Sequence, residues 1–473
     1  MGPMKMKDTD RELFETKSVW AAVLSLAIPS VIGQLILVIY NMADTFFVGL
    51  AGDDSMLAAV TVCMPAFMFL SAISNLFGVG GSSVMGREMG KGRYDRAKLA
   101  FSFSVWGCLI VSALYCLFVF LFQDAFLNLL GGSDASVHEL ADDYLLITVV
   151  IFGIPTALNT LFSHLIRAQG KSLMASAGVV IGGVLNIALD PLFMFVILPK
   201  GEAITGAAIA TGLSNFIALL YYVAAFIFAR KKVYFSLKIG KETFQNKLAL
   251  NVVTIGIPAC LMTLCENISY AILDSLMSQV SLPAQAGVGV AKKINMFAHS
   301  AVRGVAQGIL PLIAYNKSSG NRSRMKKAVY TGMGISLVLA GLSMVVNLIW
   351  ARPITSIFIQ NDESGSLSYG AAFLRIFCIG APFSAIAYMI ISFFQAVGCP
   401  YRSLLLALLR KGIIDIPLMF LLQYAIPIYG IVWATPIADA TCCLVSIVLF
   451  AHYLKKHGHD KYGYAAKAKS QIH

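Results

Sequence analysis

Twelve apolar runs recur every 35 to 40 residues along the 473-residue chain, and this recurrence constrains the fold more than any other feature. Each run can cross the hydrocarbon core of a bilayer as a helix, because crossing takes about 20 apolar residues. Only 13% of the residues are charged, against about 25% in globular proteins. The pattern predicts an all-α membrane protein with twelve transmembrane helices, at 19–48, 56–84, 99–122, 141–166, 173–196, 205–229, 251–279, 284–315, 328–350, 371–397, 403–425 and 430–454.

The distribution of basic residues predicts how these helices are oriented. Of the 36 Lys and Arg, 28 fall in segments on one side of the twelve-span arrangement, and only Lys200 and Arg352 fall on the other. Cytoplasmic loops of membrane proteins carry such an excess of basic residues. We therefore expect a multi-pass membrane protein with both termini in the cytoplasm. The net charge of +12 then belongs to loops, and a nucleic-acid partner is not expected.

The two halves of the chain repeat each other. The sequence L-A-I-P at 26–29 corresponds to I-G-I-P at 255–258, and L-D-P-L-F-M-F at 189–195 corresponds to I-D-I-P-L-M-F at 414–420. With six spans in each half, both halves start on the same side, so a pseudo-two-fold axis along the membrane normal relates them. The expected units are a cytoplasmic N-terminal segment (1–18), an N-lobe (19–229), a cytoplasmic linker (230–250), a C-lobe (251–454) and a basic cytoplasmic tail (455–473).

The first span carries a polar stripe that ends beside a single carboxylate. Gln34, Asn41 and Thr45 share one helical face, and Asp44 lies next to that face. An ionisable residue at membrane depth indicates a functional site, because a charge there is costly unless it faces water or a partner. The alternative is that Asp44 only anchors the helix at the headgroup boundary.

A second carboxylate in the first half has an amide one helical turn before it. Asn186 and Asp190 present both groups on one face. Together with Asp44 and a hydroxyl such as Thr211, these oxygens could hold a hard cation such as Na⁺ or share a proton. The alternative is that the Asn186–Asp190 pair only joins neighbouring helices.

The second half contains more acidic and basic residues within its spans. Glu266 is its best candidate for a proton or cationic-substrate site. Asp415 follows Lys411 by one turn and Arg410 by five residues, so a buried ion pair is expected there. Structural roles are expected for Asp274 and Asp439, and acid partners are needed by Lys292, Lys293 and Arg303.

Motifs of other protein classes are missing from the sequence. It has no G-x-x-x-x-G-K-[ST], so ATP is not the expected energy source, and no H-E-x-x-H or G-x-S-x-G. The nine cysteines form no C-x-x-C pairing and sit mostly inside apolar runs, as small buried hydrophobes do. We therefore expect no enzymatic activity, no cofactor and no metal other than a coupling Na⁺.

Several longer motifs resemble one family of carriers over residues 18–454. They are P-S-V-I-G-Q and N-M-A-D-T-F-F-V-G in the first span, G-R-E-M-G-K-G, L-I-R-A-Q-G-K, N-I-A-L-D-P-L-F-M and Y-G-I-V-W-A-T-P-I-A-D. The chain thus resembles the multidrug and toxic compound extrusion (MATE) family, in its MepA-like bacterial branch. The resemblance implies a V-shaped twelve-helix carrier that exports cationic or amphiphilic drugs in exchange for Na⁺ or H⁺.

The resemblance also implies roles for individual residues. Pro29 matches the first-helix proline proposed to bend on protonation, and Glu266 matches the acidic residue of the seventh helix. The tenth span lacks the carboxylate that the NorM-type branch keeps there, which favours a coupling site in the N-lobe. The implied N-lobe cation site consists of Asp44, Asn186, Asp190 and Thr211.

Taken together, these observations predict a secondary-active multidrug efflux transporter that works as a monomer among membrane lipids. Its expected drug contacts are Glu266, Gln34 and Asn41. One alternative is a lipid-precursor flippase of the same superfamily, which would favour a cationic cleft for pyrophosphate, whereas the spans here are acidic. The other is an intramembrane enzyme, which would need a nucleophile and base or a metal constellation that the sequence does not display.

Overall fold

The computed structural model describes residues 8–50, 54–130, 135–199, 201–228, 235–359 and 365–458. Within these ranges all regular structure is helical. Residues 1–7 of the expected N-terminal segment, 229–234 at the start of the expected linker and 459–473 of the expected tail lie outside the described residues.

The first half of the chain begins with a short helix, α1 (Asp8–Glu15), which is followed by six long helical units. A further short helix, α5 (Gln123–Leu130), lies between the third and fourth units. The six units are α2 (Val19–Leu50), α3 (Asp54–Gly90), α4 (Tyr94–Leu121), α6 (Ala135–Leu145) joined by the π-helix η1 (Leu146–Ile151) to α7 (Gly153–Arg167), α8 (Ser172–Leu192) with the π-helix η2 (Phe193–Ile197), and α9 (Ala203–Phe228).

The second half repeats this order of units. It starts with two short turns, α10 (Lys241–Phe244) and the 3₁₀-helix η3 (Gln245–Lys247). Its six units are α11 (Leu248–Val280), α12 (Leu282–Ser318), α13 (Arg322–Ser356), α14 (Ser366–Ile379) with α15 (Ala381–Val397), α16 (Pro400–Leu408) joined by the π-helix η4 (Leu409–Ile413) to α17 (Asp415–Ala425), and α18 (Tyr429–Gly458).

Ten of these twelve units are long and apolar enough to cross a membrane, if each bent pair counts as one span. The other two, α12 and the α16–α17 unit, are the more polar ones and match the expected spans 284–315 and 403–425. In order and position, the twelve units correspond to the twelve expected spans. The all-helical fold with two repeated halves is therefore confirmed.

Two of the expected spans are sharply bent. Helix α6 with η1 meets α7 at 50°, and α14 meets α15 at 44°. The sequence explains why the bends recur, because F-G-I-P at 152–155 and I-G-A-P at 379–382 occupy equivalent places. Proline has no backbone N–H and clashes with the preceding turn, so the helix breaks just before it.

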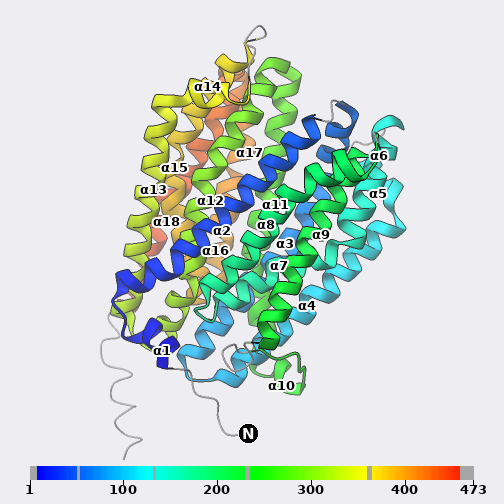
Figure 1. The fold of residues 1–473 in the computed structure, drawn as a ribbon. Coiled ribbons are helices and arrows are strands. Elements are labelled where there is room, and N and C mark those ends of the chain that lie inside the picture. Colours follow the sequence, from blue (N-terminus) through cyan, green and yellow to red (C-terminus); the bar gives the residue numbers. More distant parts are fainter. Residues whose placement is uncertain are drawn as a thin grey trace, which may run out of the picture.

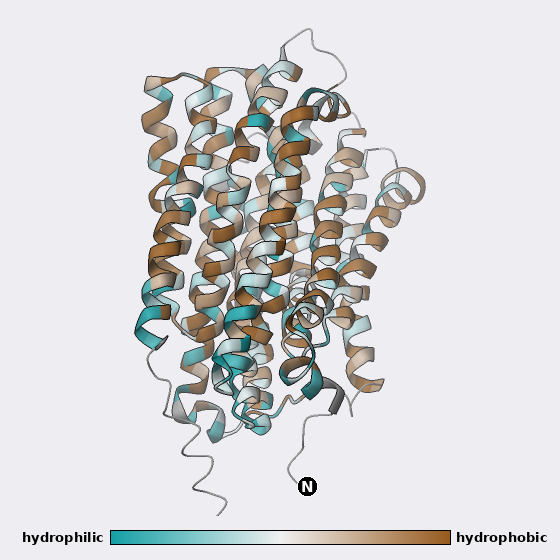
Figure 2. Cartoon of the chain, turned by 90° about the vertical axis from the view of Figure 1, so that its left-hand side faces the viewer, coloured by the Kyte–Doolittle hydropathy of each residue, from teal (hydrophilic) through white to brown (hydrophobic). Residues whose placement is uncertain are grey.

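Figure 1 shows the helices as one bundle, with α1 and α10 at one end and α5, α6 and α14 at the other. Hydrophilic residues gather towards the end where the N-terminus lies, whereas apolar residues cover most of the helix length (Figure 2). We call the end of the bundle that holds α1 and α10 the basic end below, and its cytoplasmic position stays a prediction.

The two lobes meet through glycines nearer to the basic end. Helix α3 packs along α11, and α2 packs along α12. A Cβ atom at Gly256 would overlap the backbone carbonyl of Leu76, and one at Gly308 would lie 2.8 Å from the carbonyl oxygen of Leu26. Small residues let membrane helices approach until their backbones touch. The lobes are therefore in backbone contact in this half of the bundle.

Helix α1 connects both lobes at the same end. Phe14 is fully buried and stacks on Tyr315 of α12, with 4.8 Å between the ring centroids. Arg324 of α13 donates hydrogen bonds to the backbone carbonyls of Phe14 (2.8 Å) and Leu13 (3.0 Å). On the other lobe, Gly170 packs against Leu13 and Phe14. Helix α1 thus helps to close the basic end.

We expect Gly256→Ala to destabilise the protein, because the added methyl group meets backbone that cannot move without separating α3 from α11. Overpacking of this kind costs about 1–3 kcal/mol. Gly341→Ala in α13 is the matched control, since a Cβ there meets no atom within 4 Å and alanine favours the helix. Thermal melting of the two purified variants tests the expectation, and equal melting temperatures would contradict the close packing of the lobes.

Candidate functional site

The N-lobe carboxylates lie where small residues let three helices approach closely. On α8, Gly183 packs against Ile36 of α2, and on α9, Gly206 packs against the backbone of Phe193 at the start of η2. A side chain at either glycine would push the neighbouring helix away. These contacts bring α2 and α9 to α8 at the level of its carboxylate, Asp190.

Asn186 links the polar groups of α8 and α9. Its amide nitrogen donates to Oδ1 of Asp190 and to Oγ1 of Thr211, each at 3.2 Å. Asp190 is fully buried, and Asn186 is 1% exposed. The Asn186–Asp190 contact was expected from the one-turn spacing, whereas its bond to Thr211 joins the two helices. The expected cluster of Asn186, Asp190 and Thr211 is thus present.

This cluster contains more acceptors than donors. Three buried oxygens have no hydrogen-bond donor among the described residues: Oδ2 of Asp190, Oδ1 of Asn186 and Oδ1 of Asp44. The carboxylates of Asp44 and Asp190 are close enough to interact electrostatically. Buried polar atoms are almost always hydrogen-bonded, and an unsatisfied one is costly. Spare acceptor oxygens from two carboxylates and an amide suit a proton or a hard cation.

Positive charge reaches this cluster only from across the lobe boundary. Within the described ranges neither Asp44 nor Asp190 forms an ion pair, and Lys293 of α12 is the one basic side chain that acts electrostatically on Asp44. No group of three or more His, Cys, Asp or Glu in these ranges is arranged to hold a metal ion. The cluster therefore has the composition of a monovalent-cation or proton site.

The remaining expected site residues of α2 make different contacts. Gln34 donates to Oε1 of Gln307 of α12 at 3.3 Å, so it bridges the lobes. Asn41 donates to the backbone carbonyl of Leu37 at 2.6 Å, within its own helix. Helix α2 remains helical through Pro29. The expected bending at Pro29 and the expected drug contacts of Gln34 and Asn41 stay predictions.

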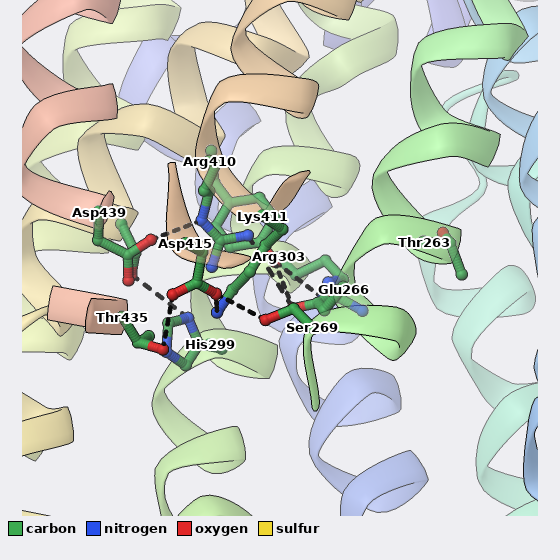
Figure 3. A network of polar contacts seen from close by, with 12 residues as sticks. Thr263, Glu266, Ser269, His299, Arg303, Arg410, Lys411, Asp415, Thr435 and Asp439 are labelled. Atoms are coloured by element: carbon green, nitrogen blue, oxygen red, sulfur yellow. Dashed lines mark hydrogen bonds and ion pairs between the residues drawn. The ribbon is translucent and has the colours of Figure 1, made fainter. Parts of the chain in front are cut away.

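Glu266 of α11 lies in a network of buried ion pairs in the C-lobe (Figure 3). Its carboxylate accepts from Arg303 at 2.7 Å and from the hydroxyl of Tyr388 at 3.2 Å. Arg410 is a further ion-pair partner, at 3.9 Å. In this arrangement the charge of Glu266 is already balanced by basic side chains of the protein.

The same network holds the other acids of the C-lobe. Asp415 pairs with Lys411 at 2.8 Å, which confirms the expected buried ion pair. It also accepts from Ser269 at 2.6 Å and from Thr435 at 3.0 Å. Arg410 turns away from Asp415 and pairs with Asp439 at 2.8 Å instead. The adjacent residues Arg410 and Lys411 are both buried, and they lie in the π-helix η4. The sequence pattern did not predict this wider helical turn.

The C-lobe network is balanced in charge, with three acids and three bases. Its members are Glu266, Asp415, Asp439, Arg303, Arg410 and Lys411. Outside the network, Lys292 pairs with Asp274, which supplies the acid partner that Lys292 was expected to need. A balanced network can stay buried because each charge is compensated. The two lobes therefore differ, since Asp44 and Asp190 of the N-lobe have no ion-pair partner among the described residues.

One arginine is buried where the sequence pattern gave no sign of burial. Arg167 belongs to a segment that is expected on the cytoplasmic side, because the apolar run before it ends at 166. In the structure Arg167 is the last residue of α7, is 3% exposed and lines a cavity between the lobes. The lobe contacts at the basic end enclose it, and a single-span pattern carries no signal for such contacts.

Comparisons with known proteins agree with this architecture. The MatE family matches residues 29–192 and 258–421, once in each lobe. The chain is 26% identical to the multidrug export protein MepA of Staphylococcus saprophyticus, over 94% of this chain and 96% of the relative. It is 27% identical to MepA of Staphylococcus aureus, with the same coverage.

Solved structures share the fold. A crystal structure of a MATE protein in the straight conformation superposes with a TM-score of 0.86 at 21% identity, covering 96% of this chain and 99% of that one. An outward-facing multidrug resistance MATE family transporter gives a TM-score of 0.85 at 21% identity and the same coverage. Since the family matches both halves of the chain, with one match in each lobe, this protein belongs to the MatE family.

Proposed function

We propose that this protein exports cationic or amphiphilic drugs across the bacterial cell membrane, as a secondary-active antiporter driven by H⁺ or Na⁺. The observation that carries the proposal is the contrast between the lobes. In the N-lobe, the buried Asp190 and the partly buried Asp44 each have an unsatisfied buried oxygen and no basic partner among the described residues, whereas the C-lobe acids are already paired. Support for the drug class comes from the relatives, which are multidrug export proteins.

In the proposed mechanism, Asp44 and Asp190 form one coupling unit. Two carboxylates in a medium of low dielectric constant cannot both remain charged at low cost, so a proton or a Na⁺ binds between them. Asn186 and Thr211 add neutral oxygens that suit Na⁺. A cationic drug needs the same negative charge, so drug and coupling ion compete. Such competition is reciprocal, because each ligand lowers the affinity of the other by the same factor.

The proposal places the protein in the membrane as a monomer with both termini in the cytoplasm. A lipid-precursor flippase is the second candidate, because Arg167 and Arg303 both line the cavity between the lobes and a cationic cavity suits an anionic headgroup. This candidate is the weaker one, because Arg303 already pairs with Glu266 and is not free to bind an anionic headgroup on its own. Transport of ethidium, an organic cation without phosphate, by the purified protein in liposomes distinguishes the two.

We expect Asp44→Asn to abolish ion-coupled ethidium export while leaving the protein stable, because no donor in the described structure bonds the buried Asp44 oxygen. By contrast, Glu266→Gln should lower the free energy of unfolding by about 1.5–3 kcal/mol, since it removes the charge-assisted hydrogen bond to Arg303 and leaves that guanidinium group without an acidic partner. Efflux from proteoliposomes and thermal melting measure the two effects. Asp124→Asn, at an 88% exposed carboxylate of α5, is the control and should transport normally. Wild-type export by Asp44→Asn would overturn the proposed role.

We also expect the effects of Asp44→Asn and Asp190→Asn on drug affinity to be coupled by about 0.5–3 kcal/mol, because both residues contribute to one site. The measurement is ethidium binding to the two single variants and the double variant, titrated against pH and Na⁺. Additive losses would mean two independent sites, and Asp190 would then serve only to join α8 to α9.

A further inference from the structure

The cavity between the lobes contains an excess of hydrogen-bond donors. It is lined by residues of α3 and α7 from the N-lobe and of α11, α12 and α15 from the C-lobe. Four buried N–H-bearing atoms on its lining residues have no acceptor among the described residues: Nε and Nη1 of Arg167, Nε of Arg303 and Nε2 of Gln395. No carboxylate lines this cavity within the described ranges. Its polarity is the opposite of that of the N-lobe acid cluster.

Arg167 is the residue that most needs a ligand. It is 3% exposed, and its buried Nε and Nη1 atoms have no acceptor within the described ranges. Gln395 of α15 is 4% exposed, and its amide nitrogen is also unsatisfied. An unpaired buried charge is very costly, whereas a charge-assisted hydrogen bond is among the strongest in proteins. The donors on both sides of the lobe boundary therefore suit one shared anion.

We propose that Arg167, Arg303 and Gln395 form a binding site for the carboxylate group of a transported amphiphile. The proposal rests on the proposed export function and extends it to a second ligand group. One negative charge is the appropriate number, because Arg303 is already paired with Glu266 and only Arg167 lacks an acid. A monovalent carboxylate therefore balances the cavity, whereas pyrophosphate would leave buried negative charge uncompensated.

The rest of the lining favours a carboxylate that belongs to an apolar molecule over a small free anion. Val79, Met262, Leu310 and Ile391 line the cavity beside the donors. Met in particular adapts to different apolar shapes. The hydroxyl groups nearby already have acceptors. Ser392 donates to the backbone carbonyl of Ala306 at 3.0 Å, and Tyr388 donates to Glu266 at 3.2 Å, so the carboxylate depends on the nitrogen donors.

The position of the donors also connects binding to transport. Arg167 belongs to the N-lobe, whereas Arg303 and Gln395 belong to the C-lobe. A carboxylate held by all three stabilises the state in which the lobes are closed at the basic end. When the lobes separate there, the donors separate too, and affinity for the anion falls.

The test compares two closely related probes on the full-length protein in detergent: norfloxacin, which has a carboxylate and an amine, and its decarboxylated analogue. We expect the wild type to prefer norfloxacin and Arg167→Gln to bind it about 10–100-fold more weakly, as for loss of hydrogen bonds to a charged group. Binding of the analogue and of ethidium should not change. Gln395→Leu should weaken norfloxacin binding about 3–10-fold. This second variant tests the same site if Arg167→Gln folds poorly.

Arg375→Gln is the matched control, because it removes one positive charge from α14 at a residue outside the cavity. It should bind both probes as the wild type does. Equal losses for all ligands in Arg167→Gln, or no preference of the wild type for norfloxacin, would overturn the proposal. Stabilisation of the wild type by sodium acetate or pyrophosphate without a preference between the drugs would likewise overturn the assignment to a substrate. If the carboxylate site is overturned in any of these ways, normal ethidium export by Arg167→Gln would still support the proposed export function.

Discussion

Compensation of buried charge is the constraint on which this structure depends. In the C-lobe, side chains from separate helices meet so that three acids and three bases neutralise one another. In the N-lobe, the carboxylates of Asp44 and Asp190 have no such partners among the described residues, and their unsatisfied oxygens suit a cation. Between the lobes, the unsatisfied N–H groups of Arg167, Arg303 and Gln395 suit an anion. Bound ligands would supply the missing partners in these last two regions, as the proposed carrier function requires.

The glycine contacts explain how unpaired groups can be buried at all. Gly206 and Gly183 bring three helices around Asp190, and Gly256 brings the two lobes into backbone contact beside the donor-rich cavity. Close packing excludes water, so each remaining polar group acts in a medium of low dielectric constant, where charges interact strongly. Lys293 of α12 acts electrostatically on Asp44 from the other lobe.

The sequence predicted what depends on local spacing. The twelve spans followed from apolar runs, and the pairs Asn186–Asp190 and Lys411–Asp415 followed from the four-residue spacing of one helical turn. It could not predict contacts between helices distant in the chain, such as Arg303 with Glu266. The burial of Arg167 was missed for the same reason, because helices of the opposite lobe help to enclose it. One signal was available: the expected spans of the second half contain six Lys and Arg, whereas those of the first half contain none.

The central claim is that a cationic drug and the coupling ion compete for the N-lobe carboxylates. It is tested most directly by adding ethidium to the purified protein in weakly buffered solution and measuring the H⁺ or Na⁺ that is released. The account predicts ion release from the wild type in proportion to the drug bound, and little or none from Asp44→Asn. Drug binding without ion release in the wild type, or undiminished release in Asp44→Asn, would contradict the account.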